Sequence, residues 1–532
     1  MPKLDAREAP PPDYYAANLR HVLGAVRARD RDLLNVGELD FIDGFLGAGS
    51  DAQRLFARLL SRKGPWLRVD SLNYAEVADT EAALCELESR GLVQRNGPIP
   101  ADALAQLLTR AELAERFPAV HAPGKPAWIL ACVGRYPDAL IRARIARRFG
   151  WVTVSAFGAF QVCRILYFGD ARHDLSSFVV EDLGIVAFER YELGARTRPF
   201  AARAELDEYL SLLGMAALSH RLDAHPQLAD ALLRRLWQPA STRIGQRQRN
   251  RTLNRLGYWH QRRGEFDEAL TAYALSDMHP ARQRRLRLLT RLQDARGAAA
   301  LAEAMARAPR CAEEEDLAAR SRGRRRFEVP TEVRALAGAR PQSIEQHALS
   351  CLVTDGGRGW HSENRFPLGL AGLLFWEQIF APVRGAFTHR FQSAPRDLFW
   401  PDFAAARRAP LAAQVAALAR PGAVAGQLRR TLEQKSGLAS QLVSWSLWQP
   451  EFVELLLAQV PEERLLTLGR TVIHDLPRLR NGFPDLLVLN GPGRVELVEV
   501  KAPTDQLQGA QRVWLALLPE LGWPARLLKF RP

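Results

Sequence analysis

Lysine, cysteine and long apolar runs are all scarce in this chain of 532 residues. With only six lysines, arginine supplies nearly all of the positive charge, so an arginine-rich genome accounts for part of the high isoelectric point. The five cysteines lie far apart and form no C-x-x-C pair, which argues against a disulfide scaffold and against a cysteine-rich zinc site. No run approaches the roughly 20 apolar residues of a membrane span, and no secretory signal opens the chain. We therefore expect a soluble cytoplasmic protein that does not contact a membrane.

The composition that remains is that of a folded, basic, multidomain protein. Hydrophobic residues make up 47% of the chain and charged residues 25%, as in globular proteins, and the length suggests roughly three to four domains. The formal net charge is +14. A globular protein this basic is expected to meet an acidic partner, and nucleic acid is the most general one.

The first 200 residues predict small DNA-binding modules. Apolar residues recur at helical spacing over residues 13–62, and a further helix ending near Gly91 resembles the last helix and wing of a winged-helix unit. Residues 1–98 are therefore predicted to form a helical, winged-helix-like domain. Residues 99–200 form a second region, in which LLTRAELAERF resembles a SAP-type helix pair. Between residues 151 and 200, the segments WVTVSAF, QVCRILYF and FVVEDLG read equally well as strands or as buried helix turns.

Residues 201–335 are predicted to be a helical repeat region. Residues 252–276 resemble a tetratricopeptide repeat, with small and aromatic residues where two helices pack closely and Gly264 in the turn between them. Positive charge concentrates in the same region, because no acidic residue lies between Asp230 and Glu265. A solubility surface normally mixes charges of both signs, so this window favours a surface that follows DNA phosphates. The candidates named for that contact are Arg247, Arg249 and Arg251.

The stretch from residue 478 to 517 carries the clearest chemistry. Asp485 opens a short apolar strand, GPG at 491–493 forms a turn, and residues 494–501 form a second strand, so the pair predicts a hairpin. Side chains alternate along a strand, which puts Glu499 and Lys501 on one face and the intervening Val500 on the core face. The hairpin then brings Asp485 near Glu499.

Two carboxylates and one ammonium at a strand end suit phosphodiester hydrolysis. Carboxylates bind hard cations such as Mg²⁺ or Mn²⁺, which polarise the phosphoryl group and activate water, and a lysine stabilises the developing charge. This is the P-D…E-x-K signature of restriction-like nucleases. An ordinary surface hairpin with a salt bridge would share the spacing. The apolar hairpin, the rarity of lysine and the amphipathic helix that follows with Gln511 in its first turn favour the nuclease.

These motifs also carry a family resemblance. R-N-G-F-P-D-L (480–486) and V-E-V-K-A-P-T-D-Q-L-Q-x-x-Q-R-V-W-L (498–515) closely resemble the VRR-Nuc domain. The upstream segments 361–380 and 386–403 are similar to the helical entry of the nuclease in the Fanconi-associated nuclease family. The resemblance implies a mostly helical, multidomain α+β protein, with a restriction-endonuclease-like mixed β-sheet in residues 336–532.

The resemblance also implies an activity and a set of site residues. It implies a structure-specific DNA nuclease, with 5′-flap endonuclease and 5′-to-3′ exonuclease activity, in interstrand crosslink repair. The implied ligands of Mg²⁺ or Mn²⁺ are Glu363, Asp485, Glu499 and the backbone carbonyl of Val500. Lys501 would be the catalytic lysine, and Gln511 would have a supporting role. No Walker-type phosphate loop occurs, so we expect no nucleotide cofactor.

The chain departs from the family pattern at two positions. Ala502 stands where a glycine often follows the lysine, and Ala510 stands where a basic residue often precedes the glutamine. Because alanine at position 510 carries no positive charge, the contact of this position with the phosphate next to the scissile one is in doubt. The residues expected to compensate are Arg478, Arg480 and Arg512. His361 lies close enough in sequence to orient Glu363.

Two alternatives to a flap nuclease remain open. A Holliday-junction resolvase would use the same domain, but it needs two active sites and therefore a dimer. A non-catalytic helical scaffold would bind DNA without cutting it, and the complete set of Asp485, Glu499 and Lys501 argues against that interpretation.

Overall fold

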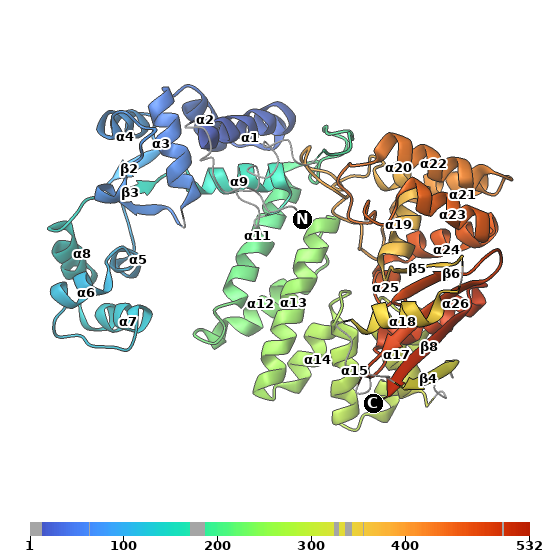
Figure 1. Cartoon of the computed structure of the whole chain (residues 1–532). Coiled ribbons are helices and arrows are strands. Elements are labelled where there is room, and N and C mark those ends of the chain that lie inside the picture. The colour runs from blue at the N-terminus through green and yellow to red at the C-terminus, as the bar shows by residue number, and fades with distance from the viewer. Residues whose placement is uncertain are drawn as a thin grey trace. The chain divides into compact units, whose positions relative to one another are not determined.

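The computed structural model describes residues 13–62, 64–170, 187–323, 329–335, 343–354, 356–502 and 505–531. These residues fall into two compact units (Figure 1). The first unit is Met1–Ile185 with Ala201–Arg203, and the second is Val186–Phe200 with Ala204–Pro532. The segment FVVEDLG at 178–184, left open as strand or helix, lies outside the described residues. None of the helices that the structure describes is long and apolar enough to cross a membrane.

The first unit begins with a helical bundle and a small sheet. Its helices here are α1 (Tyr14–Asp30), α2 (Val36–Leu46), α3 (Ser50–Ser61), α4 (Thr80–Ser89) and α9 (Phe157–Phe168). Its antiparallel sheet has the order β1-β3-β2, from β1 (Trp66–Arg68), β2 (Val93–Arg95) and β3 (Trp151–Val154). The predicted helices over 13–62 are confirmed. WVTVSAF begins as strand β3, whereas QVCRILYF lies in helix α9.

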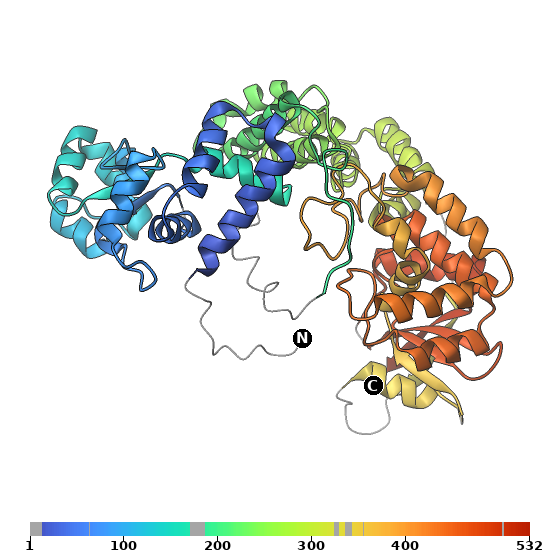
Figure 2. The ribbon, with the colours of Figure 1, turned by 90° about the horizontal axis from the view of Figure 1, so that it is seen from above.

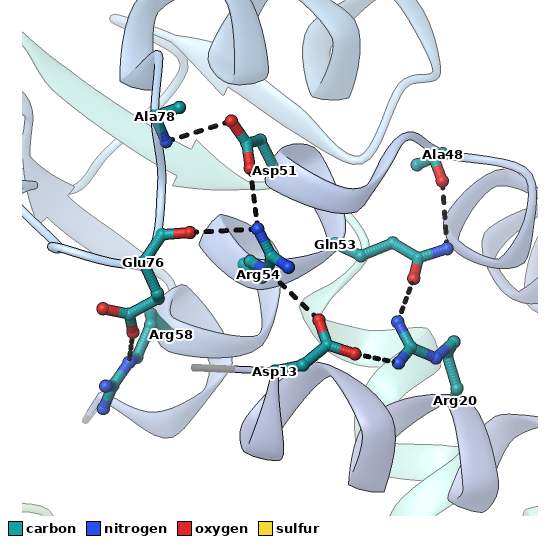
Figure 3. A network of polar contacts seen from close by, with 9 residues as sticks. All are labelled: Asp13, Arg20, Ala48, Asp51, Gln53, Arg54, Arg58, Glu76 and Ala78. Atoms are coloured by element: carbon teal, nitrogen blue, oxygen red, sulfur yellow. Dashed lines mark hydrogen bonds and ion pairs between the residues drawn. The ribbon is translucent and has the colours of Figure 1, made fainter. Parts of the chain in front are cut away.

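A polar network ties α1 and α3 to the segment before α4 (Figure 3). The guanidinium of Arg54 donates to Asp13 at 3.1 Å and to the carbonyl of Glu76 at 3.3 Å. Arg20 donates to the side-chain oxygen of Gln53 at 2.7 Å. Each contact joins two different segments, so the network holds the bundle in register beside its apolar core.

Residues between β2 and β3 form an insertion with its own core. Val152 of β3 pairs with Leu67 of β1 and with Arg95 of β2, so the chain returns to the sheet after the insertion. The inserted helices are α5 (Ala101–Gln106), α6 (Arg110–Arg116), α7 (Lys125–Arg135) and α8 (Asp138–Ala146). Their apolar residues form a separate cluster that includes Leu104 and Ile141. The boundary expected at residue 98 therefore separates two parts that share one sheet.

The second unit contains a run of helices in which α12 to α17 each pack against the next (Figures 1 and 2). They are α11 (Arg203–Ser219), α12 (Ala229–Arg235), α13 (Arg243–Arg263), α14 (Phe266–Ala274), α15 (Ala281–Arg291), α16 (Ala295–Arg307) and α17 (Ala312–Ser321). Gly264 ends α13 in a left-handed conformation, at φ +80°. A Cβ on Gly257 would lie 2.8 Å from the ring of Tyr273. The helix pair predicted from the repeat is therefore confirmed, and glycine allows its close packing.

The C-terminal part is a five-stranded mixed sheet of order β4-β8-β7-β6-β5. Its strands are β4 (Thr331–Ala335), β5 (Arg358–His361), β6 (Leu486–Leu489), β7 (Val495–Lys501) and β8 (Ala525–Arg531). β4 and β8, and β8 and β7, run parallel, whereas the other pairs are antiparallel. β4 belongs to this sheet, although the sequence assigned residues up to 335 to the helical region. The predicted α+β layout with a mixed C-terminal sheet is confirmed.

Helices cover both faces of the sheet. Helix α18 (Ile344–Leu352) packs with Val498 and Val500 on one face. Leu487 and Leu497 face the larger core on the other side. The helices around that core are α19 (Arg365–Leu374), α20 (Trp376–Ile379), α21 (Arg408–Leu418), α22 (Ala423–Lys435), α23 (Pro450–Gln459), α24 (Glu462–His474), α25 (Leu476–Leu479) and α26 (Gly509–Glu520).

Candidate metal-dependent active site

The hairpin of β6 and β7 brings Asp485 beside Glu499, as the alternation of side chains predicts. Leu486 pairs with Val498, so Asp485 lies at the strand end next to Glu499. The Oδ2 atom of Asp485 accepts a hydrogen bond of 2.8 Å from the backbone N–H of Val500. This bond fixes the carboxylate against the partner strand.

Glu499 is completely buried. Its two carboxylate oxygens differ in their hydrogen-bond partners. Lys501 Nζ lies 2.8 Å from Oε1, and Gln511 Nε2 donates to the same atom at 2.5 Å. The other oxygen is buried and has no hydrogen-bond partner among the described residues. A buried carboxylate oxygen without a partner is costly unless a cation or a proton meets it. This oxygen therefore fits a metal ligand.

Gln511 is held by the first turn of α26. Its side-chain oxygen accepts from the backbone N–H of Gln508 at 2.9 Å, while its amide faces Glu499. The glutamine thus links the helix N-terminus to the carboxylate, which fits the supporting role expected for it.

Burial and neighbouring carboxylates raise the pKa values of Glu499 and Asp485. Burial, followed by the nearby charge of Asp485, raises the pKa of Glu499 to about 7, although Lys501 opposes the shift. Burial also raises the pKa of Asp485. Buried carboxyls whose pKa values are raised next to other carboxylates, Asp485 next to Glu363 and Glu499 next to Asp485, are the expected electrostatics of a site that a divalent cation neutralises.

Glu363 reaches the same site from a strand far away in the sequence. β5 pairs with β6, and the backbone N–H groups of Ser362 and Glu363 both donate to the carbonyl of Asp485, at 2.9 and 3.1 Å. Glu363 has a left-handed backbone, with φ +40°, which is uncommon outside glycine and occurs at functional sites. The predicted grouping of Glu363 with Asp485 is therefore present in the structure.

The donor set fits a divalent cation. One ligand atom each from His361, Glu363 and Asp485 lies within 4.8 Å of the others. Carboxylate oxygens are the ligands that Mg²⁺ and Mn²⁺ prefer. Together with the partnerless oxygen of Glu499, these residues could hold the metal that the nuclease signature implies.

Arginines from two distant segments line a cavity of about 690 Å³ next to this site. Arg247 of α13 and Arg480 after α25 both face it, and so does Ala510, which directly precedes Gln511. Arg247 stacks over Trp400, at 5.0 Å from the ring centroid. Aromatic and arginine side chains of this kind bind nucleic acids. The sequence did not single out Trp400, because its contact with α13 depends on the tertiary fold.

Other predicted DNA contacts are engaged within the protein. Arg249 is buried and donates to the carbonyls of Leu236, Trp237 and Leu275, so its expected role as a phosphate contact is wrong. The reason is that it lies on the inner side of α13. Arg512 forms a two-pronged ion pair with Asp316 of α17 rather than facing the cavity.

Two further arginines were predicted to contact DNA, Arg478 and Arg251. Arg478 lines the cavity while it pairs with Glu315 at 2.8 Å and with Asp475 at 2.6 Å. Arg251 lies half-buried on α13. Of the three arginines expected to compensate for Ala510, Arg478 and Arg480 therefore face the cavity that Ala510 lines, and Arg512 does not.

The mixed sheet, the clustered carboxylates and the adjacent lysine define a restriction-endonuclease-like nuclease of the metal-dependent type. Comparison with known proteins agrees. The profile of the family described as "FAN1, HTH domain" matches residues 13–94, and that of the "VRR-NUC domain" matches residues 419–531.

Full-length relatives extend the match. The chain is 32% identical to the Fanconi-associated nuclease 1 homolog of Pseudomonas aeruginosa, over 98% of this chain and 96% of the relative. It is 27% identical to the homolog of Arabidopsis thaliana, over 97% of this chain and 67% of the relative. A crystal structure of paFAN1 bound to 2nt 5′-flap DNA with a gap superposes with a TM-score of 0.79, at 30% identity, over 98% of this chain and 99% of the other. The chain belongs to the Fanconi-associated nuclease family.

Proposed function

We propose that this nuclease cuts branched DNA at 5′ flaps and degrades strands from 5′ to 3′, with Mg²⁺ or Mn²⁺, in the repair of interstrand crosslinks. One observation carries the proposal. Asp485, Glu499 and Lys501 meet Glu363 at one end of the neighbouring strands β5, β6 and β7, beside a cavity lined by arginines. The similarity to a nuclease crystallised with 5′-flap DNA, over 98% of this chain, supports the choice of substrate.

Each residue of the site has a proposed role in phosphodiester hydrolysis. Glu363, Asp485, Glu499 and the Val500 carbonyl would hold the metal, which supplies Lewis-acid polarisation of the phosphate and an activated water. Gln511 keeps Glu499 oriented through its amide. Lys501 is positioned to stabilise negative charge that develops on the phosphate. Its ammonium needs no reorganisation, because Glu499 already holds it.

The rest of the chain is proposed to position the DNA. Residues 1–98 and 99–200 would bind duplex, residues 201–335 would support the branch point, and residues 336–532 would cut. The arginines and the stacked Trp400 along the cavity suit backbone and base contacts. The proposed place of action is the cytoplasm, at the nucleoid.

Cleavage of a labelled 5′-flap duplex tests the proposal directly. The full chain is assayed with Mg²⁺, with Mn²⁺ and with chelator, beside 3′-flap, splayed-arm and four-way-junction substrates. The inactivating variant is Asp485→Asn. Its matched control is Glu454→Gln, an exposed carboxylate that pairs only with Arg429 on the far helices α22 and α23 among the contacts described.

The outcomes separate the three functions. Metal-dependent cutting near the flap junction that is lost in Asp485→Asn and kept in Glu454→Gln supports the flap nuclease. Symmetric cutting of the four-way junction would identify a resolvase instead. DNA binding without cutting under either metal would leave a non-catalytic scaffold.

A further inference from the structure

An imidazole stands among the carboxylates of the site. His361 Nε2 lies 3.0 Å from Glu363 Oε1, and one ligand atom each from His361, Glu363 and Asp485 lies within a group 4.8 Å across. The side chains of His361 and Glu363 are 41% and 49% exposed. The imidazole is therefore open to the same solvent-accessible space as the carboxylates.

The backbone around His361 is fixed on both sides. His361 is the last residue of β5 and pairs with Leu486, the neighbour of Asp485. The guanidinium of Arg365 donates to the carbonyl of His361. The next two N–H groups along the chain donate to the carbonyl of Asp485. These contacts fix the backbone of His361 beside Asp485 before any ion binds, and a backbone that is already in place is one way in which metal sites gain affinity.

Glu499 already has a cation and a neutral donor as partners. Lys501 and Gln511 both contact Glu499 Oε1, so the positive and donor groups there serve that carboxylate. On the side of His361, the described hydrogen bond joins Nε2 only to Glu363. An imidazole nitrogen close to two carboxylates can either donate a hydrogen bond to them or bind the same metal ion as they do.

We propose that His361 Nε2 is itself a ligand of the divalent metal, together with Glu363 and Asp485, and that it makes the site select Mn²⁺ over Mg²⁺. The inference rests on the proposed function, since it concerns the metal of that reaction. Mg²⁺ is a hard ion that favours oxygen, whereas first-row transition metals also accept imidazole nitrogen. A mixed nitrogen and oxygen donor set therefore favours Mn²⁺.

The rival role for His361 is orientation of Glu363 by a hydrogen bond alone. Loss of an orienting group lowers the affinity for both metals together. Loss of a nitrogen ligand lowers the affinity for Mn²⁺ more than that for Mg²⁺. The ratio of the two dissociation constants therefore separates the two roles, and it does not depend on activity.

Electron spin-echo spectroscopy of the Mn²⁺-loaded full chain tests ligation directly. The protein is compared with His361→Ala and with His474→Ala, a matched histidine at the end of α24 that bonds the carbonyl of Arg470. Histidine alone is labelled with ¹⁵N in a parallel sample. We expect a coupling from directly bound nitrogen that shifts on labelling, disappears in His361→Ala and persists in His474→Ala.

Calorimetric titration supplies the second measurement. We expect His361→Ala to reduce the Mn²⁺-over-Mg²⁺ preference at least about tenfold, and His474→Ala to leave it unchanged. Bound Mn²⁺ with no histidine coupling, or an equal loss for both metals, would overturn the inference and leave the nuclease intact. If neither metal binds the unaltered protein, the proposed function fails with it.

Discussion

The ammonium of Lys501 lies 2.8 Å from Glu499 Oε1, with 12% of its side chain exposed. Lys501→Met keeps the apolar stem and removes the charge. We expect the cleavage rate constant on 5′-flap DNA to fall by about 100-fold or more, because a charge aimed at the transition state is lost. Metal binding, measured by calorimetry, should remain, since the carboxylates are untouched. A variant that cuts at the original rate would remove Lys501 from the mechanism.

Because the pKa of Glu499 is raised, we expect the stability of the metal-free protein to depend on pH. Burial first and the charge of Asp485 second raise this pKa from 4.5 to about 7 in the metal-free protein. The folded state then holds a proton that the unfolded chain releases, so the stabilisation is complete below pH 4.5 and is lost as the pH rises through about 7. The shift is worth on the order of 3 kcal/mol.

Thermal unfolding in the presence of chelator tests whether the stability falls as the pH rises. Between about pH 5 and pH 8 we expect the Tm of the unaltered protein to fall relative to that of Glu499→Gln, whose amide does not titrate. Saturating Mg²⁺ should reverse the trend, because the cation and the proton compete for the same carboxylate. Two parallel profiles in chelator would contradict the raised pKa.

At the scale of elements, α17 holds the helix that carries Gln511. Arg512 of α26 pairs with Asp316 of α17 at 2.7 and 2.8 Å. A Cβ on Gly509, the first residue of α26, would lie 3.1 Å from Asp316 Oδ2. The two helices thus meet at the turn from which Gln511 reaches Glu499. The helical middle of the chain therefore contacts the helix whose Gln511 holds Glu499.

A double-mutant cycle tests that support. We expect Asp316→Asn and Arg512→Met each to lower the cleavage rate about tenfold, and the double variant to be little worse, because both remove the same ion pair between Asp316 and Arg512. The control cycle uses the exposed pair Arg429 and Glu454, for which a coupling well below about 1 kcal/mol is expected. Additive losses at Asp316 and Arg512 would mean that the ion pair does not act on the site.

At the scale of the molecule, cations from the helical middle and from the nuclease part line one cavity. Arg247→Gln and Arg480→Gln should each weaken DNA binding and reduce its logarithmic salt dependence by about one, as expected for one lost phosphate contact. Fluorescence anisotropy over a range of salt concentrations measures both quantities. Arg429→Gln is the control. An unchanged salt dependence in the first two variants would exclude the cavity from the DNA interface.

The local part of the site could be predicted because it depends on short-range geometry. Strand alternation places Glu499 and Lys501 together, and a tight turn returns the chain to Asp485. Helical periodicity places Gln511 in the first turn of α26. The rare lysine among many arginines marked the position where an ammonium is needed.

The sequence by itself therefore determined the hairpin, its carboxylates, its lysine and the nuclease class. Only the tertiary structure decided that β5 pairs with β6 and brings Glu363 and His361 to Asp485, that β3 returns to the first sheet, and that Arg249 is buried. Periodicity shows which face of an element is apolar, but not which distant element covers it. That choice depends on long-range backbone pairing and on the burial of complementary side chains, which no local pattern encodes.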